Sequence, residues 1–224
     1  MIRKKTVLIL ADDFPPGFGL RMGYLAKFLE EHDWNGIVIA AISMYETRYN
    51  FDSLSDHIHI PCERIYIPNN KKKRSILHKV LSFFFPDMRI PWGVDKKMDE
   101  HINQWAAKVR FDIVLSSTYG LFPLNVAYKT ARTLKIPWIA DLRDIYEQYP
   151  IKGTFLRMLY NKIGLLRRNY LLRTASMITT VSKKHVEILT SYGLNACYIY
   201  NGADTDIFTP SSHHKFNEFR IVYT

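Results

Sequence analysis

Polar and charged side chains follow directly after short apolar runs of this sequence. The stretch "PWIADLRDIYEQYP" (137–150) changes from apolar to charged at Asp141, Arg143 and Asp144. Carboxylates that flank a guanidinium can hold it in place or accept hydrogen bonds from sugar hydroxyls. An ion-pair cluster without any ligand fits the same residues equally well, so both interpretations stay open at this point.

A glycine-rich loop follows the first apolar run, in "DDFPPGFGLRMG". A loop that opens a helix in this way favours a phosphate, because backbone N–H groups point at the ligand. The candidate residues of this loop are Gly17, Phe18, Gly19 and Arg21. The spacing resembles a dinucleotide fingerprint, but the second apolar run ends in "IAAIS" and lacks the acid of an NAD site. We therefore expect either a tight turn or a site for an anionic or sugar ligand.

Two further stretches place polar groups after apolar runs. "SSTYG" offers the hydroxyls of Ser117 and Tyr119, although a strand-to-helix cap explains this stretch without a ligand. "YNGADTDIFTP" brings Asn201 and Asp204 close behind an Asn-Gly turn, and in isolation it predicts only that turn.

The apolar runs alternate with helical patterns along the chain. Strands are expected at 6–11, 36–41, 64–68, 112–117, 137–141, 177–182 and 197–200. Helices are expected at 20–31, 94–109, 121–134, 154–174 and 183–192, and in "SILHKVLSFFF". This alternation predicts an α/β fold, a Rossmann-like open parallel sheet with helices on both faces. Ligands of such sheets bind at the carboxyl ends of the strands, where the polar stretches lie.

The composition is globular and strongly basic. The 224 residues are 47% hydrophobic and carry 31 Lys and Arg against 21 Asp and Glu, a net charge of +10. This balance predicts an anionic partner such as a nucleotide, a phosphorylated substrate or a lipid surface. Nucleic acid is not expected, because no recognition helix or stacking platform is evident. Only two cysteines and no run of about 18 apolar residues predict a cytoplasmic protein.

A basic run directly precedes an apolar helical segment. The run consists of Lys71, Lys72, Lys73 and Arg74. The segment "SILHKVLSFFF" follows, with Phe83 and Phe84 near its end. This order is typical of a surface helix that dips into an anionic membrane. A core helix next to solvated charges is the alternative interpretation.

Taken together, the polar stretches resemble one family. Its members carry a Pro-Pro and glycine-rich first loop with an Arg soon after, "P-(W/F)-(I/V)-x-D-x-R-D", "T-x-V-S" and "N-G-(V/A)-D-x-x-x-F-x-P". The matching segments are 15–21, 137–144, 179–182 and 201–210, in the same order. The chain resembles the amino-terminal half of a retaining GT-B glycosyltransferase, from the large family that includes sucrose and glycogen synthases and bacterial polysaccharide transferases. It departs from many members at "SSTYG", where they have a His that contacts the transferred sugar.

The resemblance implies transfer of a sugar from a nucleotide-sugar donor to a lipid-linked or polysaccharide acceptor, with the anomeric configuration retained. It implies no metal and no other cofactor, and a position in the cytoplasm or on the inner face of the cell membrane. Residues 1–210 would form the acceptor-side domain, and 211–224 a linker and the first strand of a donor domain that holds the main catalytic residues. The polar residues named above would line the cleft between the two domains. Two alternatives are a non-catalytic sugar- or nucleotide-binding module and one half of a GT-B nucleotide-sugar epimerase.

Overall fold

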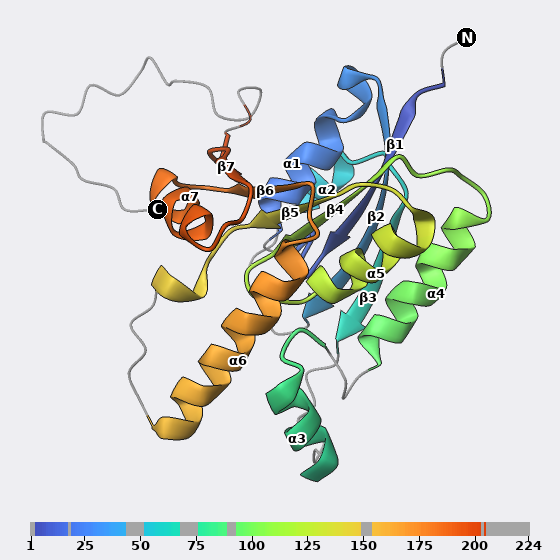
Figure 1. The fold of residues 1–224 in the computed structure, drawn as a ribbon. Helices are drawn as coiled ribbons and strands as arrows, with labels where there is room; N and C mark the ends of the chain where they lie inside the picture. The colour runs from blue at the N-terminus through green and yellow to red at the C-terminus, as the bar shows by residue number, and fades with distance from the viewer. Residues whose placement is uncertain are drawn as a thin grey trace, which may run out of the picture.

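A computed structural model describes residues 3–17, 19–43, 52–67, 76–88, 93–148, 154–202 and 204. Within these ranges, seven parallel strands form one sheet in the order β3-β2-β1-β4-β5-β6-β7 (Figure 1). The strands are β1 (Lys5–Ala11), β2 (Trp34–Ser43), β3 (Cys62–Ile67), β4 (Ile113–Thr118), β5 (Trp138–Leu142), β6 (Met177–Thr180) and β7 (Ala196–Tyr198). The sheet confirms the Rossmann-like parallel architecture that the alternation of the sequence predicts.

Helices connect successive strands. They are α1 (Leu20–Phe28), α2 (Asp52–Asp56), α3 (Ile76–Phe84), α4 (Val94–Ala106), α5 (Leu124–Leu134), α6 (Phe155–Leu172) and α7 (Lys183–Ser191), with 3-10 turns η1 (Glu30–His32) and η4 (Tyr146–Gln148). Every helix except α2 was expected from the sequence. α2 and the two 3-10 turns were not expected, because such short elements leave no helical period to recognise. None of the described helices combines the length and the apolar character needed to cross a bilayer.

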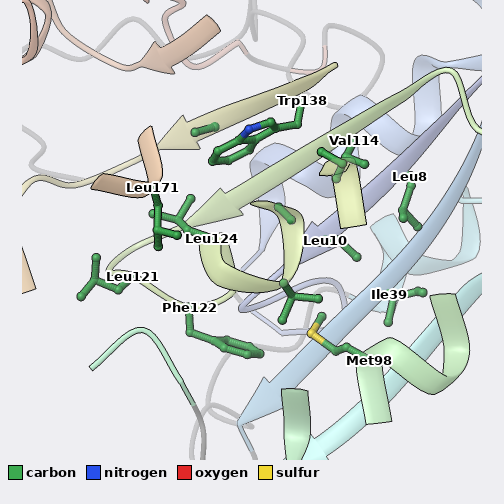
Figure 2. Packing of buried hydrophobic residues seen from close by; sticks show 14 of the residues in the cluster. Leu8, Leu10, Ile39, Met98, Val114, Leu121, Phe122, Leu124, Trp138 and Leu171 are labelled. Carbon is green, nitrogen blue, oxygen red and sulfur yellow. The ribbon is translucent and has the colours of Figure 1, made fainter. Parts of the chain in front are cut away.

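Alternate residues of the central strands face opposite sides of the sheet. In β1, Leu8 and Leu10 join the larger core with α4, α5 and the end of α6, whereas Val7 and Ile9 face α1. Met98 of α4 lies over this larger core (Figure 2). Because both faces are covered, the strands can be continuous apolar runs, and each fully buried aliphatic side chain contributes about 1.5–3 kcal/mol.

The strand register aligns polar residues across the carboxyl edge of the sheet. Ala11, the last residue of β1, lies opposite Ser117 of β4. Ser117 lies opposite Asp141 of β5, and Asp141 lies opposite Thr179 of β6. Three polar side chains on neighbouring strands therefore meet at the edge where parallel sheets bind their ligands.

Candidate functional site

Asp141 is the centre of a polar cluster at the carboxyl edge. Its side chain is buried, and its carboxylate accepts hydrogen bonds from Ser117 Oγ at 3.0 Å and Thr179 Oγ1 at 2.7 Å. Arg21 Nε donates to both carboxylate oxygens at 3.1 Å. A counterion and two hydroxyl donors satisfy a buried acid without any ligand. Asp141 therefore belongs to an ion pair, but its partner is Arg21 and not Arg143, the neighbour that the sequence suggested.

Arg21 joins this cluster to the segment that follows β7. It lies in the first turn of α1 and donates from Nη1 to Asn201 Oδ1 at 3.0 Å and to the carbonyl oxygen of Tyr200 at 3.3 Å. The Asn-Gly stretch thus supplies an amide oxygen and a carbonyl oxygen to the arginine that also holds Asp141. One guanidinium therefore connects the first helix, the fifth strand and the chain after the last strand.

A second contact between α1 and this segment lies further along the helix. Lys27 Nζ is 2.6 Å from Asp204 Oδ2. The side chain of Asp204 is 1% exposed and that of Lys27 is 14% exposed, so the pair is shielded from solvent. Asp204 therefore stabilises the packing of its segment on α1, at some distance along the helix from Arg21.

Arg143 lies next to the cluster and pairs with a different acid. Its Nη2 donates to Asp12 Oδ1 at 2.6 Å, and the centre of its guanidinium lies 3.2 Å from the ring centroid of Tyr119. Asp12 also accepts from the backbone N–H of Tyr119 at 2.8 Å and from Thr118 Oγ1 at 3.0 Å. Nε and Nη1 of Arg143 are buried and have no hydrogen-bond partner in the described part of the chain. Such unsatisfied donors are costly and rare in native proteins, so these two atoms are candidates for binding a water, an ion or a ligand.

Asp144 lies on the other side of Arg143 in the sequence and accepts a hydrogen bond from Gln148 Nε2 at 2.7 Å. Its negative charge also interacts with His185, which lies in the first turn of α7. Nδ1 of His185 is 3.0 Å from Thr180 Oγ1. Burial lowers the pKa of His185, and the negative charges of Asp144 and Glu147 oppose this shift. The net effect favours the neutral imidazole near the carboxyl end of β6.

The glycines of the first loop are packed against the loop itself. A Cβ on Gly19 would lie 2.3 Å from the carbonyl oxygen of Asp13 and 2.5 Å from Phe14 Cα. A Cβ on Gly17 would lie 2.3 Å from Asp13 Oδ1. These contacts support the tight-turn interpretation of the loop, since a side chain would displace backbone at Gly19 and the Asp13 carboxylate at Gly17. Phe18 lies outside the described residues.

The structure therefore brings most of the predicted site residues together. Those linked by direct contacts at the carboxyl edge are Arg21, Ser117, Tyr119, Asp141, Arg143 and Asn201. Sequence reasoning missed Asp12, Lys27 and His185 as partners, although Asp12 directly follows the run 6–11 and is placed like the acids after β5. Phe83 and Phe84 belong to α3, and the basic run 71–74 lies outside the described residues. Among the described residues, no three His, Cys, Asp or Glu side chains gather where a metal ion could bind.

The sequence matches a known family over most of its length. The profile of Glycosyltransferase Family 4 covers residues 47–207. The chain belongs to this family. Three of the polar stretches of the carboxyl edge lie wholly or largely within the matched range, and the glycine-rich first loop precedes it. No curated protein matches the sequence.

Solved structures share the fold of this family 4 domain. Sucrose-phosphate synthase from Thermosynechococcus elongatus superposes with a TM-score of 0.60 at 12% identity, over 93% of this chain and 51% of that one. UGT2 from Phytolacca americana, in complex with UDP-2-fluoro-glucose and pterostilbene, superposes with a TM-score of 0.54 at 9% identity, over 92% of this chain and 56% of that one. These likenesses confirm a GT-B type domain, and the chain spans about half the length of both structures.

Proposed function

We propose that this chain is the acceptor-side domain of a glycosyltransferase that moves a sugar from a nucleotide-sugar donor to a glycan or lipid-linked acceptor, with retention of configuration. Membership of family 4 supports the transfer of a sugar, and the resemblance of the polar stretches supports retention. The observation that carries the proposal is Arg143, whose two unsatisfied donor atoms lie at the carboxyl edge of the sheet.

Arg143 is prepared to bind an anionic or oxygen-rich group. Asp12 holds Nη2 at 2.6 Å and the Tyr119 ring holds the plane of the guanidinium. Nε and Nη1 remain for a ligand, and a guanidinium fork suits two oxygens of a phosphate or carboxylate. Because both atoms are closed off from solvent, a ligand reaches them only after a neighbouring side chain moves.

The other charged residues of the cluster act as its frame. Asp141 fixes Arg21, and Arg21 fixes the segment after β7 through Asn201. A frame of this kind keeps the edge rigid, so that little reorganisation is needed when the donor and acceptor bind. The proposal includes no metal, since helix dipoles and basic side chains can offset the charge of a nucleotide diphosphate.

The test is a transfer assay on the full gene product. The protein is incubated with radiolabelled nucleotide sugars and a membrane extract of its source, and label is followed into lipid and glycan fractions. NMR of the product then reports the anomeric configuration. Each hydrogen bond from a charged donor contributes about 1.5–3 kcal/mol, so Arg143→Met should lower kcat/KM on the order of 100-fold or more. Arg143→Lys should restore little, because lysine lacks the planar fork.

The matched control is Arg132→Met. Arg132 is an exposed arginine on α5 that donates to the Tyr128 hydroxyl at 2.6 Å, and its loss should leave transfer unchanged. Transfer that is equally fast in Arg143→Met and the native protein would remove Arg143 from the site. Release of a free epimerised sugar nucleotide without acceptor would make the protein an epimerase. Tight binding of a nucleotide sugar without turnover would leave a binding module.

A further inference from the structure

The described structure carries an exposed apolar surface on two helices that are distant in the sequence. On α3 and directly after it, the exposed large apolar residues are Ile76, Leu77, Val80, Phe84 and Phe85. In the first two turns of α6, they are Phe155, Leu156, Met158, Leu159 and Tyr160. These residues together are called the apolar tip below. Ile76 is 80% exposed and Phe155 is 77% exposed, so burial in the domain does not explain their apolar character.

The two parts of the apolar tip lie side by side. The ring centroid of Phe83 is 5.7 Å from that of Tyr160, and α3 packs on α6 (Figure 1). Arg167, further along α6, donates to both carboxylate oxygens of Asp87, at 3.0 and 2.8 Å. Asp87 follows α3 closely and its side chain is 0% exposed. A two-pronged ion pair with a buried carboxylate and a partly exposed guanidinium therefore fixes the position of α3 against α6.

The apolar tip extends beyond the sheet because α6 is longer than the strands that it connects. α6 has 18 residues and is about 27 Å long. β5 and β6 have 5 and 4 residues, which span roughly 13–17 Å. The buried residues of α6 begin only at Gly164. Since α6 follows β5, its first half extends past the carboxyl edge, the edge that carries Arg143.

The charged side chains that α3 and the exposed half of α6 carry are all positive. Neither α3 nor α6 contains an Asp or Glu, while Lys79, Arg157 and Lys162 are exposed on them. The basic run 71–74 directly precedes α3 in the sequence, although its position is outside the described residues. An apolar surface bordered by cations complements a bilayer with anionic headgroups. A second copy of the same surface would instead bring like charges together.

We propose that the apolar tip inserts into the interfacial layer of an anionic lipid bilayer, with Lys79, Arg157 and Lys162 at the headgroups. The surface includes the first half of α6, which the sequence pattern presents as a basic helix only. Membrane docking by this tip turns the carboxyl edge of the sheet toward the bilayer. The proposal stands on exposure and charge alone, so it does not depend on the transfer of a sugar.

The test measures binding of the protein to vesicles by flotation. Vesicles of equal parts phosphatidylcholine and phosphatidylglycerol are compared with vesicles of phosphatidylcholine alone. We expect binding to the mixed vesicles that weakens at high salt, and much weaker binding to the neutral ones. In Phe155→Ser/Leu156→Ser the partition coefficient should fall roughly tenfold for each side chain removed from the bilayer. Loss of one exposed cation, as in Arg157→Ala, should lower it about fivefold.

Matched controls come from exposed residues elsewhere on the chain. Ile199→Ser removes an apolar side chain that is 51% exposed after β7, and Lys96→Ala removes a cation of α4 whose side chain is 84% exposed. Both should bind vesicles as the native protein does, and circular dichroism checks that every variant is folded. Native binding by Phe155→Ser/Leu156→Ser would overturn the proposal. A dimer without vesicles that the same variant dissociates would also overturn it, because the apolar tip would then be a contact between copies.

Discussion

Replacing Asp141 with asparagine tests whether its carboxylate holds the polar cluster together. Asparagine has nearly the same shape but no charge, and it presents an NH₂ group where aspartate presents an oxygen. In Asp141→Asn, Arg21 loses the counterion that its Nε contacts at 3.1 Å. The NH₂ group of the asparagine would also face the hydroxyl of Ser117 or of Thr179, which now donates to that position and would have to rotate away.

The expected cost follows from burial. Removing one partner of a buried ion pair costs about 3–5 kcal/mol. The Arg21 side chain is 15% exposed and that of Asp141 is 2% exposed, so water relieves a small part of the unpaired charge. We therefore expect the free energy of unfolding to fall by about 3 kcal/mol. In a domain of this size, that lowers Tm by roughly 6–12 °C.

Urea unfolding followed by circular dichroism measures this change, and a double-mutant cycle assigns it. Arg21→Met alone should also destabilise, since it leaves the buried carboxylate without its cation. The double variant should cost about 2 kcal/mol less than the sum of the single ones, because neither unpaired charge is left. Strictly additive costs, or a cost below about 1 kcal/mol for Asp141→Asn, would refute the idea that this pair frames the site.

Three further substitutions or reactions test other parts of the structure. Gly19→Ala should lower the free energy of unfolding in urea by about 2 kcal/mol or more, because its Cβ would lie 2.3 Å from a backbone oxygen. The control is Gly120→Ala, whose Cβ meets nothing within 4 Å and which should be tolerated. Equal losses in the two variants would contradict the packing of the loop. Burial works to raise the pKa of Glu147, but the hydrogen bonds and charge of Arg168 outweigh it and hold that pKa below its ordinary value. This stabilisation is present above the unfolded pKa of about 4.3 and is lost as pH falls through the folded pKa. The free energy of unfolding should therefore depend less on acidic pH in Glu147→Gln than in the native protein. An unchanged dependence on pH would count against the ion pair of Glu147 with Arg168. Burial raises the pKa of the Cys62 thiol to about 11, so its alkylation at neutral pH, followed by peptide mass spectrometry, should be roughly 100-fold slower than in urea; equal rates would show an open thiol.

The strands and long helices could be predicted from the sequence because each has a clear physical signature. Strands covered on both faces are continuous apolar runs, and the helices keep a period of 3.6 residues between turn residues. The fold class and the edge that carries the polar residues followed from this pattern. The choice of ion-pair partners did not. Asp141 and Arg143 are two positions apart and invite pairing, yet each finds its partner more than 100 positions away.

Those partners depend on the strand order. Because β1 lies next to β4, the end of β1 brings Asp12 to Arg143 and the start of α1 brings Arg21 to Asp141. The order of the strands in the sheet cannot be predicted from the residue pattern of any single strand or helix. The apolar surface on the first half of α6 was missed for a related reason. Its residues alternate with cations in a helical period, and only the length of the neighbouring strands shows that this half has no sheet to cover.

The two contacts between α1 and the segment after β7 have a mechanical consequence. Arg21 holds Asn201, and Lys27 holds Asp204, so the chain leaves the sheet from a point that is clamped to a helix. A force applied to the chain at Asp204 would be transmitted to α1 through these two contacts. Because Arg21 also contacts Asp141, a displacement of Asn201 would be transmitted to the polar edge of the sheet.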